Sequence, residues 1–75
     1  MKFIEFDGEI IRADLITLVT KPEGYPMDGD DADYYTWRIY NEGHLVWEFF
    51  ADKESSFQKR DELKQLLFSF NKEEL

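Results

Sequence analysis

The chain has 75 residues and no cysteine, which limits it to one small domain and excludes disulfides and thiolate metal sites. Its 17 acidic and 9 basic residues give a net charge of −8. The basic residues are scattered, so phosphates would repel the chain, and direct nucleic-acid binding is excluded as an expected function. Neither an apolar run near the ~20 residues of a membrane span nor a secretory start appears. We therefore expect a cytoplasmic protein that does not enter a membrane.

The first part of the chain predicts short strands. Apolar residues alternate over 1–6, and the Asp-Gly pair at 7–8 suits a tight turn because glycine adopts positive φ at no steric cost. The β-branched residues that follow favour strand over helix. We predict a short strand at 9–12, a corner at 13–14 and a longer strand at 15–21.

Residues 22–33 are rich in Pro, Gly and Asp and predict a long acidic loop between two strands. Four aspartates lie within residues 28–33. An EF-hand calcium loop needs an oxygen ligand at its fifth position, Gly at its sixth and Glu at its twelfth. Counted from the first aspartate, these positions hold alanine, aspartate and isoleucine, so the pattern fails. We interpret the run as a solvated connector, with a looser Ca²⁺ or Mg²⁺ site as the alternative, formed by Asp28, Asp30 and Asp33.

The stretch YYTWRIYNEGHLVWEFFA, residues 34–51, predicts a β-hairpin. A two-residue loop would place Trp37 opposite Glu48. A three-residue loop gives one wholly apolar face and puts Gly43 where a type I turn with a bulge requires positive φ. We therefore predict the second register, which pairs Ile39 with Leu45, Trp37 with Trp47 and Tyr35 with Phe49.

The last part of the chain predicts a helix capped by Asp52 or by Ser55, the latter in a capping box with Gln58. Its buried stripe is formed by Leu63, Leu66, Leu67 and Phe70. The sum is a single α+β domain over 1–75, an antiparallel meander of four to five strands packed by one C-terminal helix.

Three stretches carry this layout: FDGEIIRADLITLV, WRIYNEGHLVWEFFADKE and ELKQLL. In them the chain resembles short uncharacterised bacterial proteins that combine a β-meander with a C-terminal helix. The resemblance implies this fold plan and no particular activity.

No constellation of residues predicts catalysis. A general base needs a substrate or nucleophile and an orienting partner, whereas His44 is expected in solvent at the hairpin tip, opposite Tyr40. A chain of this length leaves little volume for both a core and a substrate cleft. A Gly-rich phosphate loop, a nucleophile elbow and a zinc pattern are all missing from the sequence. We therefore predict that the protein is not an enzyme and uses no cofactor.

The supply of aromatic side chains exceeds what one helix can cover. Both faces of the predicted hairpin carry rings, and Phe57 and Phe68 lie off the buried stripe of the helix. Strong sheet curvature around a second core layer would cover this excess; a partner would also do so, most commonly a second copy in a two-fold dimer. We expect the partner, bound through an interface formed by Tyr34, Arg38, Tyr40, Val46, Phe50 and Phe68.

These features predict a small non-catalytic protein-interaction module that forms a homodimer or binds another protein through an aromatic sheet face. The acidic loop would steer a basic partner, with an effect that salt weakens. Two alternatives stay open. The charge and size also suit an acidic inhibitor that mimics nucleic acid and occupies a basic groove, and the aspartates suit a loop that responds weakly to Ca²⁺ or Mg²⁺.

Overall fold

A computed structural model of the chain describes residues 2–74, and the side chains among them as far as Ser69. Met1 and the Phe70 side chain, both used in the sequence predictions, lie outside this description. The elements in chain order are β1 (Phe3–Phe6), β2 (Glu9–Arg12), a 3₁₀ turn η1 (Ala13–Leu15), β3 (Leu18–Val19), β4 (Glu23–Tyr25), β5 (Tyr34–Asn41), β6 (His44–Ala51) and α1 (Lys53–Glu74).

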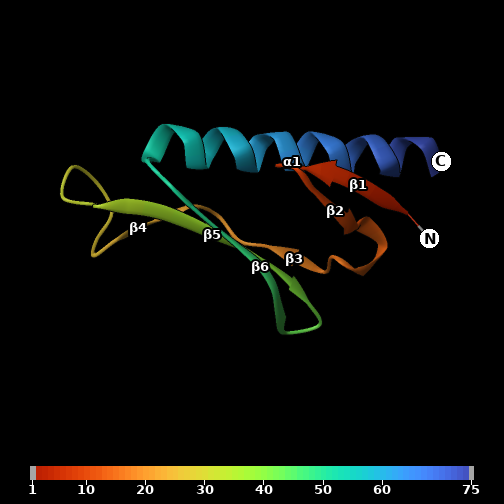
Figure 1. Cartoon of the computed structure of the whole chain (residues 1–75), viewed down its shortest axis with the longest axis horizontal. Coiled ribbons are helices and arrows are strands. Elements are labelled where there is room, and N and C mark those ends of the chain that lie inside the picture. Colours follow the sequence, from red (N-terminus) through yellow and green to blue (C-terminus); the bar gives the residue numbers. More distant parts are fainter. Residues whose placement is uncertain (1, 75) are drawn as a thin grey trace.

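The strands form two antiparallel sheets. One is the β1–β2 hairpin; in the other, β5 pairs with β6 along one edge and with β3 and β4 along the other. Figure 1 shows α1 running along the length of the molecule, with the four-stranded sheet on one side of it and β1–β2 beside its C-terminal half. The predicted α+β meander with a C-terminal helix is confirmed, with six strands in place of four or five.

The core lies where α1 meets both sheets. Its buried members are Ile4 and Phe6 of β1, Trp37 and Ile39 of β5, and Leu63 of α1. The two sheets do not pair with each other, so the helix and the shared apolar side chains hold them together.

Both hairpins close through two-residue turns in which each residue has positive φ. The values are 52° and 79° at Asp7 and Gly8, and 51° and 88° at Glu42 and Gly43. Turns of this kind match the twist of the flanking strands. The predicted turn at 7–8 is confirmed, whereas the three-residue loop predicted at 41–43 is wrong.

A bulge in β6 corrects the predicted register of the second hairpin. Near the turn Tyr40 faces Leu45, but beyond the irregularity Ile39 faces Trp47 and Trp37 faces Phe49. The predicted pairing of Trp37 with Trp47 is therefore wrong. The two-residue turn by itself would pair odd-numbered residues of one strand with even-numbered residues of the other. The extra residue in β6 shifts the rest of the strand by one position, so that odd-numbered residues face each other again. The predicted apolar face is thus kept except for Leu45, which is exposed.

The segment before β5 also differs from prediction. The strand predicted at 15–21 is shorter, because η1 takes up its beginning, and β4 lies inside the loop predicted at 22–33. Pro22, which has no N–H to donate, separates β3 from β4. In β4, a Cβ added to Gly24 would lie 2.9 Å from the Ala32 Cβ and 3.0 Å from the Met27 carbonyl oxygen, so glycine lets the loop after β4 pack this closely against the strand.

Asp52 caps α1. Its Oδ1 accepts a hydrogen bond from the Ser55 backbone N–H at 2.7 Å, and this bond lowers the pKa of Asp52. The first of the two predicted caps is therefore correct, and Ser55 lies inside the helix. One turn on, the Ser56 carbonyl accepts a hydrogen bond from Trp37 Nε1 at 3.0 Å, which ties the start of the helix to the centre of the sheet.

Candidate functional site

The face of the four-stranded sheet that is turned away from α1 carries a group of incompletely covered rings. Side chains alternate along a strand, so Trp37 and Ile39 point toward the helix while Arg38 and Tyr40 point away from it. We call this surface the outer sheet face and define it by the side chains of Tyr25, Tyr34, Arg38, Tyr40, Leu45, Glu48 and Phe50.

The strand register places four of the six predicted interface residues on the outer sheet face: Tyr34, Arg38, Tyr40 and Phe50. Val46 is the extra residue of the bulge in β6, exposed but without a partner on β5. Phe68 lies apart from this face, because it belongs to α1, which covers the opposite face of the sheet. Sequence reasoning also missed Tyr25, which was placed in the acidic loop but belongs to β4 and faces Tyr34 across the strands. The sequence signal for this strand was the Glu-Gly-Tyr stretch, in which Glu23 and Tyr25 are two residues apart and therefore share one face of a strand.

Three rings form the aromatic part of this face. Tyr25 stacks on Tyr34 with ring centroids 5.7 Å apart, and Tyr34 meets Phe50 at 5.6 Å. Beneath them Thr36, opposite Phe50, is buried. Phe50 itself stays 56% exposed and Leu45, opposite Tyr40, stays 54% exposed, so these two apolar side chains are the least covered part of the face.

An ion pair lies at the centre of the outer sheet face. Arg38 donates from Nε to the Glu48 carboxylate directly across the strands. The hydrogen bond to Glu48, with a smaller contribution from the Tyr25 hydroxyl, raises the pKa of Arg38. Because the two charges neutralise each other locally, this polar centre adds no net charge to the surface.

The outer edge of β6 has no strand partner in the described part of the chain. The Arg38 N–H donates to Thr20 Oγ1 at 2.8 Å, and the Arg38 C=O accepts from the Thr20 N–H at 2.9 Å. Arg38 therefore directs its backbone groups away from β6, and Glu48 opposite it directs its own groups away from β5. By the same alternation, the backbone groups of Glu48 and Phe50 face the open edge.

The aspartate loop is tied to the sheet. Asp28 Oδ1 accepts the Gly24 N–H at 2.6 Å, and the Tyr25 carbonyl accepts the Asp33 N–H at 2.7 Å. Asp30 is exposed. Among residues 2–74 no group of three His, Cys, Asp or Glu side chains is arranged to hold a metal ion, so the three candidate ligands are not brought together.

His44, considered as a general base, lies exposed at the tip of the second hairpin. It faces Asn41 and not Tyr40, because the turn has two residues instead of three. The Thr17 hydroxyl is bonded at the base of this turn: its Oγ1 accepts the Glu42 N–H at 2.8 Å and donates to the Tyr40 carbonyl at 3.1 Å.

Asp14, the middle residue of η1, is expected to titrate far below an ordinary aspartate. Arg12 Nη2 donates to its Oδ2 at 2.6 Å, and this bond lowers the pKa of Asp14 from 3.8 to about 2. The folded-state pKa is below the unfolded value, so the pair stabilises the fold above pH 3.8 and the effect is lost as pH falls through about 2. Carboxyl-carbon NMR should place the Asp14 midpoint near this lower value. In Arg12→Gln it should return toward 3.8, and an equally low midpoint there would contradict the pairing.

Comparisons with protein-family models, with curated proteins and with solved structures found no match to this chain. Within residues 2–74, the structure contains no helix with the length and apolar character required to span a lipid bilayer. The function is therefore argued from the geometry of the outer sheet face.

Proposed function

We propose that the chain is a small non-catalytic protein-interaction module that pairs with a second copy of itself through the outer sheet face and the outer edge of β6. The observation that carries this proposal is the position of Phe50. Its side chain is 56% exposed on the outer sheet face, and its backbone groups face the unpaired edge of the same strand.

Pairing between two copies suits both features. An eight-residue edge strand presents a row of unpaired N–H and C=O groups, which are a template for another strand. Two β6 strands that meet antiparallel about a two-fold axis would each supply the groups of Glu48 and Phe50, and would extend the sheet across the dimer. The same step would bring the apolar side chain of Phe50 against the partner and remove it from water.

The net charge gives this dimer a characteristic response to salt. Each copy carries −8, so two copies repel each other at long range, and salt screens that repulsion. We expect the dimer to become tighter as NaCl rises from roughly 0.05 to 0.5 M. A basic partner steered by the aspartate loop would show the opposite trend.

Sedimentation equilibrium over a range of concentrations tests the proposal, with Phe50→Glu as the disruptive variant. Two acidic groups would then meet at the interface, and the dissociation constant should rise about tenfold or more. Ile10→Glu is the matched control. Ile10 is 75% exposed on β2, so this variant also replaces an exposed apolar side chain by glutamate, but outside the four-stranded sheet. A parent protein that stays monomeric at all concentrations would overturn the proposal.

Hydrogen exchange locates the contact. In the dimer the Glu48 amide should exchange more slowly as concentration rises, because its N–H gains a partner across the new edge. In Phe50→Glu this concentration dependence should disappear. A dimer whose Glu48 amide exchanges at the monomer rate would contradict pairing through β6.

A further inference from the structure

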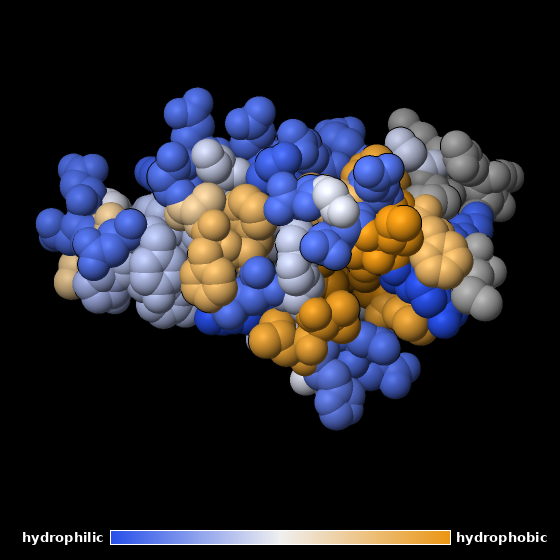
Figure 2. Space-filling model, in the orientation of Figure 1, coloured by the Kyte–Doolittle hydropathy of each residue, from blue (hydrophilic) through white to orange (hydrophobic). Residues whose placement is uncertain are grey.

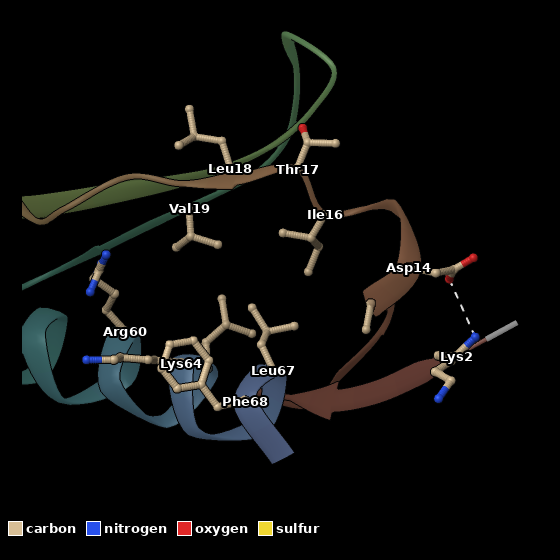
Figure 3. A pocket seen from close by; sticks show the side chains of 12 residues that line it. Lys2, Asp14, Ile16, Thr17, Leu18, Val19, Arg60, Lys64, Leu67 and Phe68 are labelled. Atoms are coloured by element: carbon tan, nitrogen blue, oxygen red, sulfur yellow. Dashed lines mark hydrogen bonds between the residues drawn. The ribbon is translucent and has the colours of Figure 1, made fainter. Parts of the chain in front are cut away.

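An open groove of about 630 Å³ lies between α1, β3 and η1 (Figure 3). Ile16 and Val19 line it from one side, and Leu63 and Leu67 line it from the helix. Leu63 is buried and the other three are half-buried, so the floor is apolar but not closed. In Figure 2, hydrophilic side chains cover the outer side of α1, and hydrophobic side chains gather beneath it around β2 and β3. The volume falls within the range of small-molecule sites.

The charge of the groove is opposite to that of the whole chain. Its lining contains Lys2, Arg60 and Lys64 but only one acidic residue, Asp14. The Asp14 carboxylate is already paired with Arg12 at 2.6 Å. In a chain with a net charge of −8, the groove is therefore a positively charged site with an apolar floor.

Two of these cations lie together at one end of the groove. Arg60 and Lys64 are four residues apart on α1, and Figure 3 shows their side chains at the same end, away from Lys2 and Asp14. Arg60 donates from Nε to the Thr20 carbonyl at 2.8 Å. This bond holds the guanidinium in place without using its two Nη groups.

The second cation is also held in position. Lys64 Nζ lies 5.6 Å from the centroid of the Phe68 ring, a cation–π contact at the groove wall. Phe68, 54% exposed, lines the groove beside the buried floor. The side chain of Leu18 points away from the helix, on the same side of the sheet as Tyr40 (Figure 3). The site thus combines a pair of positioned cations with an apolar channel that continues from them.

We propose that this groove binds a free fatty acid, a ligand with one linear hydrocarbon chain and a terminal carboxylate. The carboxylate would lie between Arg60 and Lys64, which offer charged donors. The hydrocarbon chain would lie along Ile16, Val19 and Leu67 and remove their exposed surface from water. This ligand satisfies both properties of the groove, whereas a neutral apolar molecule would offer no anion to Arg60 and Lys64. The inference does not depend on the proposed dimer, because the groove lies on the helix side of the sheet.

Titration calorimetry and methyl NMR with dodecanoate, kept below the concentration at which it forms micelles, test the proposal. Binding should be accompanied by shifts of the Ile16, Val19 and Leu67 methyl groups. Acetate carries the head group alone and dodecyltrimethylammonium carries the same chain with the opposite charge, and neither should bind in the groove. Equal binding of dodecanoate and dodecyltrimethylammonium would overturn the proposal, as would the absence of dodecanoate binding.

Charge variants on α1 identify the head-group site. Lys64→Gln should weaken dodecanoate binding about tenfold, and Lys64→Glu should weaken it further, because a charged hydrogen bond is lost and then replaced by repulsion. Lys53→Glu makes the same reversal on the same helix outside the groove, and its affinity should equal that of the parent. Both lysines are exposed, so the variants should fold, which the unchanged spectra of distant residues would verify.

A peptide arm separates the fatty acid from a protein ligand. A short apolar peptide with a free carboxyl terminus, added under the same conditions, should bind more weakly than dodecanoate because its backbone groups would be buried without partners. A peptide that binds in the groove more tightly than dodecanoate would overturn the proposal and assign the site to a protein segment. Lys64→Glu and Lys53→Glu variants with equal affinity for dodecanoate would also overturn it.

Discussion

Trp37→Ala is expected to leave the protein unfolded at 25 °C. The Trp37 side chain is 1% exposed and contacts rings from both sheets, with centroid distances of 5.8 Å to Phe6, 6.0 Å to Trp47 and 5.4 Å to Phe49. Removing a buried Trp side chain costs about 3–5 kcal/mol. A domain of this size has about that much stability in total. The substitution therefore removes most or all of the free energy of unfolding.

Urea unfolding followed by circular dichroism measures this effect. Trp37→Phe is the matched control, because it keeps a large ring in the core but loses the hydrogen bond from Nε1 to the Ser56 carbonyl. We expect the control to fold with a loss of about 1–3 kcal/mol, from the lost Nε1 hydrogen bond and from the smaller ring. A Trp37→Ala protein with the midpoint of the parent would show that the ring is not central to the core.

Ser56→Ala and Thr36→Val are each expected to stabilise the fold. Ser56 is 0% exposed and Thr36 is 2% exposed, and within the described residues neither hydroxyl oxygen has a hydrogen-bond partner. A buried polar group without a partner is costly, so removing it at constant shape should gain about 1 kcal/mol at each position. For a domain of this size, such a gain raises the melting temperature by about 4–8 °C.

Thr20→Val is the control for this prediction. The Thr20 hydroxyl accepts a hydrogen bond from the Arg38 N–H at 2.8 Å, so the same chemical exchange should lower the melting temperature there. Differential scanning calorimetry of the variants distinguishes the two cases. A lower melting temperature in Thr36→Val would mean that its hydroxyl is satisfied in solution.

The faces of the β5–β6 hairpin could be predicted from the sequence, but the pairing could not. Alternation alone separates Trp37 and Ile39 from Arg38 and Tyr40, and the core confirms this division. The partners depend on the turn, and the observed turn requires Glu42 at a φ of 51°, which is uncommon for a residue other than glycine. The compensating bulge has no local sequence signal, so the register follows from packing of the whole sheet.

The outer sheet face was predicted for the same reason, and its omissions also have physical causes. Tyr25 was missed because Pro and Gly neighbours predict a loop, whereas pairing with β5 stabilises three residues of strand there. Phe68 was grouped with residues of the outer sheet face, from which it lies apart, because helical periodicity gives the angles between side chains and not which side of the sheet the helix covers. The groove was missed because residues distant in the chain, such as Ile16 and Leu67, meet only in the folded protein.

The irregularity in β6 makes the length of that segment as important as its composition. Val46 is the extra residue: it has no partner on β5, while Leu45 before it faces Tyr40 and Trp47 after it faces Ile39. Deleting Val46 would leave a regular ladder with Trp47 still opposite Ile39, whereas deleting one residue more would place Glu48 opposite Ile39 and turn its carboxylate into the interior. The hairpin should therefore tolerate the loss of one amino acid and not of two, a rule that no single substitution would reveal.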